Sequence, residues 1–317
     1  MTKAATGWAD VVGEARWASW SVERADRLDW LNQLPADSVD LCCFSPPYEA
    51  ARTYGVDFKL KGQEWVDWMV ATFRACSRVC KGLIACVCEG QTRGYRWSAT
   101  PALLMADLHR AGFNLRRPCI FHRVGIPGSG SFDWFRADTE YIVCVTRPGR
   151  LPWSDNTAMG RPPKWAPGGE MSHRLSDGTR TNQWGKTGDN LPSSQGRRVV
   201  RGSADGDTLT KDAYLPPAIA NPGNLLSLKV GGGLMGHQLA HENEAPYPLG
   251  LPEFFVRSCC PPGGAVCDPF SGSGSTGHAA LLWGRRFIGC DVRESQVELT
   301  RRRLESVTPM MFNGAKP

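Results

Sequence analysis

The sequence lacks several features that mark membrane, secreted and zinc-binding proteins. No apolar run approaches the roughly 20 residues needed to cross a bilayer, and the first residues lack the apolar core of a signal peptide. The 12 Cys among 317 residues are too sparse for a disulfide scaffold and form no pair of CxxC motifs that would bind zinc. We therefore expect a cytoplasmic protein with reduced thiols, no membrane association and no metal site.

The chain does contain enough apolar material for a large core. Hydrophobic residues make up 41% of the sequence, with 12 Phe and 12 Trp, which excludes wholesale disorder. A length of 317 residues exceeds a usual single core, so one domain with insertions or two domains are expected. The net charge of +6 permits a polyanionic partner without requiring one.

Strand and helix patterns alternate along most of the chain. A short strand is expected just before Asp26, and buried strands at 39–44 and 83–88. The apolar stripe at 63–80 predicts a helix, with Lys81-Gly82 as its stop. This alternation predicts an α/β fold with a mostly parallel sheet and helices on both faces. Further helices are expected at 27–35, 101–112, 251–259, 275–283 and 294–306, and further strands at 140–146, 265–267 and 286–291.

The segment between these two regular regions differs in composition. Residues 147–224 are rich in Gly, Pro, Ser, Thr and Asn, and regular structure is expected to return at Leu251. Between 150 and 215 the chain carries ten Lys/Arg against seven Asp/Glu, a net charge of +3. Long loops within compact domains are usually functional or disordered, so this stretch is interpreted as a long, basic insertion.

A glycine-rich loop follows one of the predicted strands. Residues 268–277 read DPFSGSGSTG, and Asp291 ends the next strand. The spacing Gly272-x-Gly274-x-x-Gly277 formally matches the dinucleotide fingerprint, which makes a nicotinamide enzyme one alternative. However, four residues separate the strand from the first glycine, and the Asp268 carboxylate suits an ammonium group better than a pyrophosphate. S-adenosylmethionine, which has an ammonium group, a ribose and no phosphate, fits this pattern better.

A second motif, Ser45-Pro46-Pro47-Tyr48, follows the strand at 39–44. Ligands of open α/β sheets bind beyond the carboxyl ends of the strands, so a parallel sheet would bring both motifs to one edge. The Ser45 hydroxyl and the Pro46 carbonyl could accept the two N–H groups of a base amine and aim its lone pair at a methyl donor, and Tyr48 could stack on the base.

With these residues, the sequence resembles the DNA amino-methyltransferases that use S-adenosylmethionine. The likeness extends over 26–48, 64–89, 139–149, 241–277 and 285–304, with the catalytic motif before the cofactor motif, as in the permuted, beta-type arrangement. It implies a Rossmann-like, three-layer class I methyltransferase fold made of a catalytic half (19–149), a target-recognition insertion (150–224) and a cofactor half (225–308), with extensions at 1–18 and 309–317. It assigns catalysis to Ser45, Pro46, Pro47 and Tyr48, and cofactor binding to Asp26, Asp268, Pro269, Phe270, Gly272, Gly274, Ser275, Thr276 and Asp291.

Several choices of substrate remain open at this point. Members with Ser at the first motif position mostly methylate cytosine N4 and those with Asp mostly adenine N6, so Ser45 favours cytosine, with adenine as the alternative. Methylation at carbon 5 requires a nucleophilic Cys after Pro; Pro118-Cys119 has this order but lies away from both motifs and is interpreted as a core cysteine. An RNA or protein methyltransferase and an inactive nucleic-acid-binding protein are the remaining rivals.

The resemblance also implies partners. The expected substrate is double-stranded DNA with the target base flipped out of the helix, and a cognate restriction endonuclease is expected as a functional partner. A monomer or homodimer encoded by a prokaryote or phage is expected. In the insertion, Arg and Lys are expected to contact phosphates or guanine edges, and Trp to stack on unpaired bases.

Overall fold

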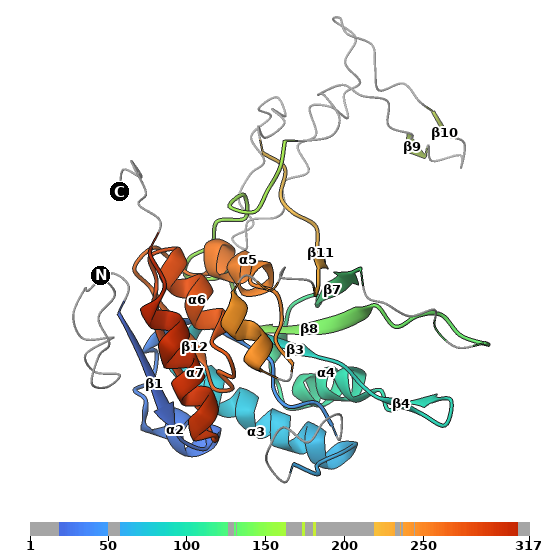
Figure 1. Cartoon of the computed structure of the whole chain (residues 1–317). Coiled ribbons are helices and arrows are strands. Elements are labelled where there is room, and N and C mark those ends of the chain that lie inside the picture. Colours follow the sequence, from blue (N-terminus) through green and yellow to red (C-terminus); the bar gives the residue numbers. More distant parts are fainter. Residues whose placement is uncertain are drawn as a thin grey trace, which may run out of the picture. The chain divides into compact units, whose positions relative to one another are not determined.

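The computed structural model describes residues 19–49, 58–125, 130, 132–162, 173–174, 180–181, 219–231, 235, 237–243 and 245–309 (Figure 1). These residues fall into two compact units, one formed before Gly160 and after Pro222 and the other by Gly160–Pro222. In the second unit the described residues form a bridge between Arg161 and Ala220 and a short hairpin of β9 (His173–Arg174) and β10 (Arg180–Thr181). The first unit holds the sheet described next.

A nine-stranded sheet organises the described part of the first unit. Its strand order is β1-β13-β12-β2-β3-β8-β7-β11, and β6 pairs with β8 beside this path. Neighbours are parallel except where β8 pairs antiparallel with β3, β7 and β6. The strands are β1 (Trp20–Arg24), β2 (Val39–Phe44), β3 (Cys80–Cys88), β6 (Asn114–Leu115), β7 (Cys119–Val124), β8 (Thr139–Thr146), β11 (Leu225–Lys229), β12 (Ala265–Asp268) and β13 (Arg286–Asp291).

Two groups of helices cover the two faces of this sheet. The group α2 (Arg27–Gln33), α3 (Gln63–Val79) and α4 (Thr100–Arg110) packs on one side, and α5 (Gly250–Cys259), α6 (Ser275–Leu282) and α7 (Glu294–Glu305) on the other (Figure 1). Successive strand residues alternate between the two apolar clusters: Cys42 and Phe44 belong to the first, and Leu41 and Cys43 to the second. Both faces are therefore buried, which confirms the three-layer α/β fold.

The 12 cysteines serve this core. All are free thiols and ten are buried, as expected for reduced cysteines that act as small apolar residues. Burial raises the pKa of Cys43 and Cys290 well above the ordinary thiol value, so both stay protonated. No helix of the described residues is long and apolar enough to cross a membrane.

Two predictions from the sequence are wrong. The helix at 63–80 does not stop at Lys81-Gly82; α3 ends at Val79, and β3 begins at Cys80 and runs through both residues. The packing of β3 against β2 requires a glycine at position 82, because a Cβ there would lie 1.9 Å from the backbone oxygen of Asp40 on β2. Regular structure also returns before Leu251: β11 pairs in parallel with β7, and a 3-10 helix, η1, spans Gln238–Glu242.

The close approach at Gly82 gives a test of the register between β2 and β3. Gly82→Ala is expected to lower the free energy of unfolding by about 1–3 kcal/mol, because the added methyl group meets backbone that cannot move freely. Urea denaturation would measure the change, with Gly223→Ala as control because the nearest atom to its added Cβ is 4.0 Å away. Equal midpoints for the two variants would contradict this strand packing.

Candidate active site

A cleft of about 940 Å³ lies at the edge of the sheet where β1, β13, β12 and β2 end. Register places these four strand ends side by side, because Arg24 pairs with Asp291, Asp268 with Gly289 and Cys42 with Cys267. The two sequence motifs therefore meet at one edge, as expected from a parallel sheet. Of the predicted site residues, the cleft wall includes Asp26, Ser45, Pro46, Pro47, Tyr48, Pro269, Phe270, Gly272 and Asp291.

The Ser45–Tyr48 segment is held in place from both sides. The indole Nε1 of Trp65 on α3 donates a hydrogen bond of 2.8 Å to the carbonyl of Pro47. The Tyr48 hydroxyl donates to Glu140 Oε2 at 2.7 Å, and Ser45 Oγ lies 3.5 Å from that hydroxyl. These contacts fix the direction in which the motif leaves β2.

Glu140, on β8, links this motif to the far side of the cleft. Its other oxygen, Oε1, lies 3.1 Å from Nη1 of Arg123 on β7. Burial and the neighbouring Glu140 raise the pKa of Tyr48 well above the ordinary tyrosine value, so the phenol stays neutral and keeps donating its hydrogen bond.

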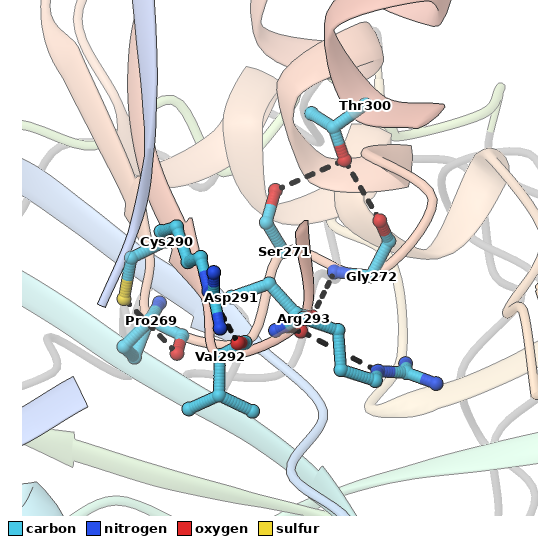
Figure 2. A network of polar contacts seen from close by, with 9 residues as sticks. Pro269, Ser271, Gly272, Cys290, Asp291, Val292, Arg293 and Thr300 are labelled. Atoms are coloured by element: carbon cyan, nitrogen blue, oxygen red, sulfur yellow. Dashed lines mark hydrogen bonds and ion pairs between the residues drawn. The ribbon is translucent and has the colours of Figure 1, made fainter. Parts of the chain in front are cut away.

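The glycine-rich loop is tied to the end of β13 by Asp291. Figure 2 shows Asp291 accepting from the backbone N–H of Gly272 at 3.1 Å and from that of Arg293 at 3.0 Å. Thr300 on α7 donates to the Gly272 carbonyl at 2.8 Å. Gly272 has a φ of +52°, and a Cβ there would come within 3.1 Å of the Asn243 side chain, so a glycine suits this turn.

Four predicted cofactor residues lie behind the cleft wall rather than on it: Asp268, Gly274, Ser275 and Thr276. Thr276 donates to the carbonyl of Cys43 at 3.1 Å, which joins the start of α6 to β2, and it also hydrogen bonds to the Tyr247 hydroxyl. Asp268 accepts from the Phe270 N–H at 2.9 Å. These side chains shape the loop, and their direct contact with a cofactor stays a prediction.

Burial gives Asp268 an unusual proton affinity. Its side chain is nearly inaccessible, and desolvation of the carboxylate raises the pKa of Asp268 to about 7 from its ordinary 3.8, against the opposing effect of the Phe270 N–H. A group that titrates near neutral pH beside a cleft is a common feature of functional sites.

A buried arginine on α7 supports the same loop through hydrogen bonds. Arg303 on α7 is fully buried; its Nη1 donates to the Ser273 carbonyl at 3.1 Å and to Ser275 Oγ at 3.0 Å, and its Nε to His278 Nδ1 at 3.2 Å. Burial lowers the pKa of Arg303 to about 10 and that of His278 to about 4, so Arg303 is charged and His278 neutral at pH 7. Arg303 is thus a rigid support for the Ser273–Ser275 turn.

Aromatic side chains form another part of the wall. Phe270 packs against Trp68 and Phe44, with ring centres 5.4 and 5.6 Å apart, and Phe58 packs on Trp68 at 5.1 Å. The Arg27 guanidinium lies 3.9 Å from the Trp68 ring centre. Asp26 caps α2 by accepting from the Leu28 N–H at 2.8 Å, and it also lines the cleft.

Comparison with known sequences agrees with this site. Residues 39–302 match the profile of the N6_N4_Mtase family, described as DNA methylase. The chain belongs to this family. Its members use S-adenosylmethionine as their methyl donor.

Individual relatives differ in how much of this chain they match. The Type II methyltransferase M2.MboI of Moraxella bovis is 32% identical over 112 residues, 35% of this chain and 36% of its own length. The chain thus spans about a third of that relative. The DNA adenine methyltransferase YhdJ of Escherichia coli K12 is 24% identical across 90% of this chain and 82% of its own length. The Type II methyltransferase M.PvuII of Proteus hauseri is 25% identical across 86% and 80%.

Solved structures show the same fold. The PvuII DNA methyltransferase (cytosine-N4-specific) superimposes with a TM-score of 0.60 at 18% identity, covering 90% of this chain and 86% of that one. The complex of TTHA0409 from Thermus thermophilus with S-adenosyl-L-methionine gives a TM-score of 0.55 at 21% identity, covering 93% and 99%.

The residues of the cleft fit this cofactor. Of the four carboxylates in the wall, Asp26 and Asp291 lie at the ends of β1 and β13 and can accept hydrogen bonds from hydroxyl and ammonium groups. The backbone of Gly272 lies on the cleft wall without a side chain over it, and the aromatic wall beside it offers a flat apolar surface. A cleft of about 940 Å³ is within the usual size of a small-molecule site.

Sequence reasoning missed several residues that build the site: Trp65, Trp68, Glu140, Asn243, Tyr247 and Arg303. Tyr247 and Glu140 are polar residues beside apolar segments, which is a weak signal, and Arg303 resembles any charged residue of a surface helix. Cys119, the alternative nucleophile, begins β7, is half-buried and is not in the cleft wall. Among the described residues no group of three His, Cys, Asp or Glu is placed to hold a metal ion.

The raised pKa of Asp268 predicts a pH-dependent stability. A carboxyl group whose folded pKa is about 7 stabilises the fold fully below about pH 4, and this contribution is lost as pH rises through 7. Compared with Asp268→Asn, the wild-type free energy of unfolding should therefore fall by up to about 1.4 kcal/mol per pH unit between these limits.

Urea denaturation at a series of pH values measures this fall. The control is Asp29→Asn, at an exposed aspartate of α2, in which the fall should persist because Asp268 is still present. Parallel stability curves for the wild type and Asp268→Asn would show that Asp268 does not titrate in this range.

Proposed function

We propose that this protein transfers a methyl group from S-adenosylmethionine to the exocyclic N4 amine of cytosine in double-stranded DNA. The observation that carries the proposal is the meeting of Ser45-Pro46 and the Pro269–Gly272 turn in one cleft, at the adjacent ends of β2 and β12. Bound there, S-adenosylmethionine would supply an electrophilic methyl group. No residue need form a covalent intermediate, because positioning of the amine performs the catalysis.

Several residues of the cleft contribute to this positioning. Ser45 Oγ and the Pro46 carbonyl accept the two amine protons and direct the nitrogen lone pair toward the cofactor side of the cleft. Tyr48, kept neutral and held by Glu140, stacks on the base. Asp291 and Asp26 hold the cofactor's polar groups, and Phe270 with Trp68 provides an apolar surface beside them. Because Ser45 is a weak base, the amine proton leaves to water after the transfer.

Ser45 at the first motif position favours cytosine over adenine, and M.PvuII, to which the chain is 25% identical, is a cytosine-N4-specific methyltransferase. Adenine N6 is the second candidate, because YhdJ, 24% identical, is named a DNA adenine methyltransferase. Digestion of modified DNA and identification of the methylated nucleoside decides between them. N4-methylcytosine is the expected product, and N6-methyladenine would replace the cytosine assignment with the adenine one.

The organisation of the chain follows from this proposal. Residues 19–149 and 225–308 would be the catalytic and cofactor halves of one methyltransferase domain in beta-type order, and 150–224 the target-recognition insertion, with extensions at 1–18 and 309–317. Most of the insertion, including Trp165 and Trp184, lies outside the described residues. Arg150, Trp153 and Arg161 are among the described ones, and contact of any insertion residue with bases stays a prediction. A restriction endonuclease acting on the same DNA site would be the functional partner.

Removal of the Ser45 hydroxyl and of the Pro46 ring tests the catalytic assignment. The double variant Ser45→Ala/Pro46→Ala should lower kcat for DNA methylation by about a hundredfold or more, because the amine loses the Ser45 acceptor and the Pro46 carbonyl is no longer held by a rigid ring. Radiolabelled methyl transfer measures kcat, and calorimetry should find cofactor affinity nearly unchanged. Ser77→Ala, on α3 and outside the cleft wall, is the control. A wild-type rate in the double variant would refute the assignment.

Asp291 is expected to hold the ribose hydroxyls of the cofactor, and its removal tests cofactor binding separately. Asp291→Ala should weaken S-adenosylmethionine binding by at least about tenfold, since a lost charge-assisted hydrogen bond costs about 1.5–3 kcal/mol. Isothermal calorimetry measures the affinity, with Glu298→Ala on the exposed face of α7 as control. If Asp291→Ala binds the cofactor as tightly as the wild type, the cofactor lies elsewhere. If the wild type binds no S-adenosylmethionine at all, the inactive nucleic-acid-binding alternative gains support.

A further inference from the structure

Exposed aromatic side chains are concentrated at one place in the molecule. Nine large hydrophobic residues are exposed in the described part of the chain, and every aromatic one lies on one of two segments. The first is the hairpin of β4 (Thr92–Arg93) and β5 (Arg96–Trp97), and the second is the stretch 132–138 that leads into β8. We name the five side chains the aromatic rim: Tyr95, Trp97, Phe132, Trp134 and Phe135.

The exposure of the rim is extreme for aromatic residues. Tyr95, Trp134 and Phe135 expose 90%, 73% and 83% of their surface, and Phe132 is fully exposed. Trp134 and Phe135 contact each other, with ring centres 5.5 Å apart, but no core residue covers them. Large apolar side chains gathered on a surface in this way usually mark a binding site, because their exposure to water is costly.

Both segments rise from the walls of the active-site cleft. Gln91 and Thr92, at the base of the hairpin, line the cleft, as do Arg123 and Ala137 at the base of the second segment. Trp97 stacks on Tyr141 of β8 at 6.2 Å, which connects the hairpin to the strand that the second segment enters. Figure 1 shows both segments extending beyond the body of the sheet. The rim segments therefore border the cleft.

The second segment is anchored firmly at its base. Arg123 donates its backbone N–H to the Asp138 carbonyl at 2.7 Å and its Nη2 to the Ala137 carbonyl at 2.8 Å. Arg136 pairs with the Asp138 carboxylate at 3.1 Å. Gly130, with a φ of +80°, packs so closely that a Cβ would lie 2.8 Å from the Trp134 carbonyl. The aromatic tip is thus presented by a fixed loop.

We propose that the aromatic rim stacks on DNA bases bordering the extruded target base, with Phe132, Trp134 and Phe135 entering the gap that the base leaves. This inference rests on the proposed function, which requires base flipping from a duplex. Apolar wedges inserted between base steps are a known way to stabilise an opened duplex. The hairpin residues 91–98 carry Arg93 and Arg96 and no acidic residue, whereas residues 132–138 carry Arg136 against Asp133 and Asp138, so the two segments together have three Arg against two Asp, a net charge of +1. The positive charge of the hairpin side favours a polyanion over a second copy of this chain or an apolar bilayer.

Stacking on unpaired bases was expected from the sequence for Trp residues of the insertion. In this proposal the aromatic rim performs that stacking. The first segment contributes Tyr95 and Trp97 on one side of the cleft mouth, and the second contributes the three wedge residues. Stacking on bases is tolerant of sequence, so the rim would support base opening while other residues select the site.

Binding of two DNA probes tests the proposal without knowledge of the recognised sequence. One probe is a short duplex with a central unpaired bubble, which supplies unstacked bases, and the other is the same duplex fully paired. Fluorescence anisotropy over a series of NaCl concentrations gives the affinity and its salt slope, which reports phosphate contacts. The proteins are the wild type, the triple variant Phe132→Ala/Trp134→Ala/Phe135→Ala and the control Leu225→Ala, an exposed apolar residue of β11.

The triple variant is expected to bind the bubble probe about tenfold more weakly or worse at every salt concentration, with an unchanged salt slope. Cofactor affinity should equal that of the wild type, since none of the three side chains lines the cleft. Leu225→Ala should match the wild type in both measurements.

Three results would overturn the inference. Wild-type affinity of the triple variant for the bubble probe would remove the stacking role. A loss of self-association in light scattering, with DNA binding intact, would make the rim an interface between copies of the chain. A wild type that binds the cofactor but neither DNA probe would refute the proposed DNA substrate as well, and this separates failure of the proposed function from failure of the wedge alone.

Discussion

The parallel register of β1, β13, β12 and β2 is the constraint on which the whole site depends. It places the ends of four strands, and therefore Asp26, Asp291, the glycine-rich loop and Ser45-Pro46, along one edge of the sheet. The Thr276 hydroxyl fastens this arrangement by bonding the start of α6 to the Cys43 carbonyl in β2. Residues more than 200 positions apart in the sequence are thereby brought to one cleft.

Buried charged side chains are a second feature on which the site depends. The glycine-rich loop is fixed by groups that are expensive to bury: Asp268 below it, Arg303 under the Ser273–Ser275 turn, and Asp291 at its edge. Asp268 and Asp291 accept from the backbone N–H groups of Phe270 and Gly272, and Arg303 donates to the Ser273 carbonyl and the Ser275 hydroxyl, so the loop and its supports stabilise each other. The Ser45–Tyr48 segment is fixed in a similar way, because Glu140 accepts a hydrogen bond from Tyr48 and Trp65 donates one to the Pro47 carbonyl. The two motifs are thus held rigid before any ligand binds, as catalysis by positioning requires.

Local patterns in the sequence predicted most of the strands and helices and nine residues of the cleft wall, because apolar periodicity and loop motifs are encoded in neighbouring residues. Contacts between strands that are far apart in the sequence could not be predicted in this way. Gly82 looks like a helix stop, yet it is a strand residue that allows close approach to Asp40. β11 is defined by its pairing with β7, and Glu140 by its contacts with Tyr48 and Arg123. The exposed aromatics of the rim could only be recognised once their burial was known.

The most direct test of this account is a crystal structure of the protein with S-adenosylmethionine or a non-reactive analogue. The account predicts the ligand in the cleft between the Pro269–Gly272 turn and Ser45-Pro46, with its ribose at Asp291 and its methyl group, or the equivalent atom, directed toward Ser45. A ligand bound outside this cleft, or one whose reactive group points away from Ser45, would contradict the claim that the ends of β2 and β12 form the methyl-transfer site.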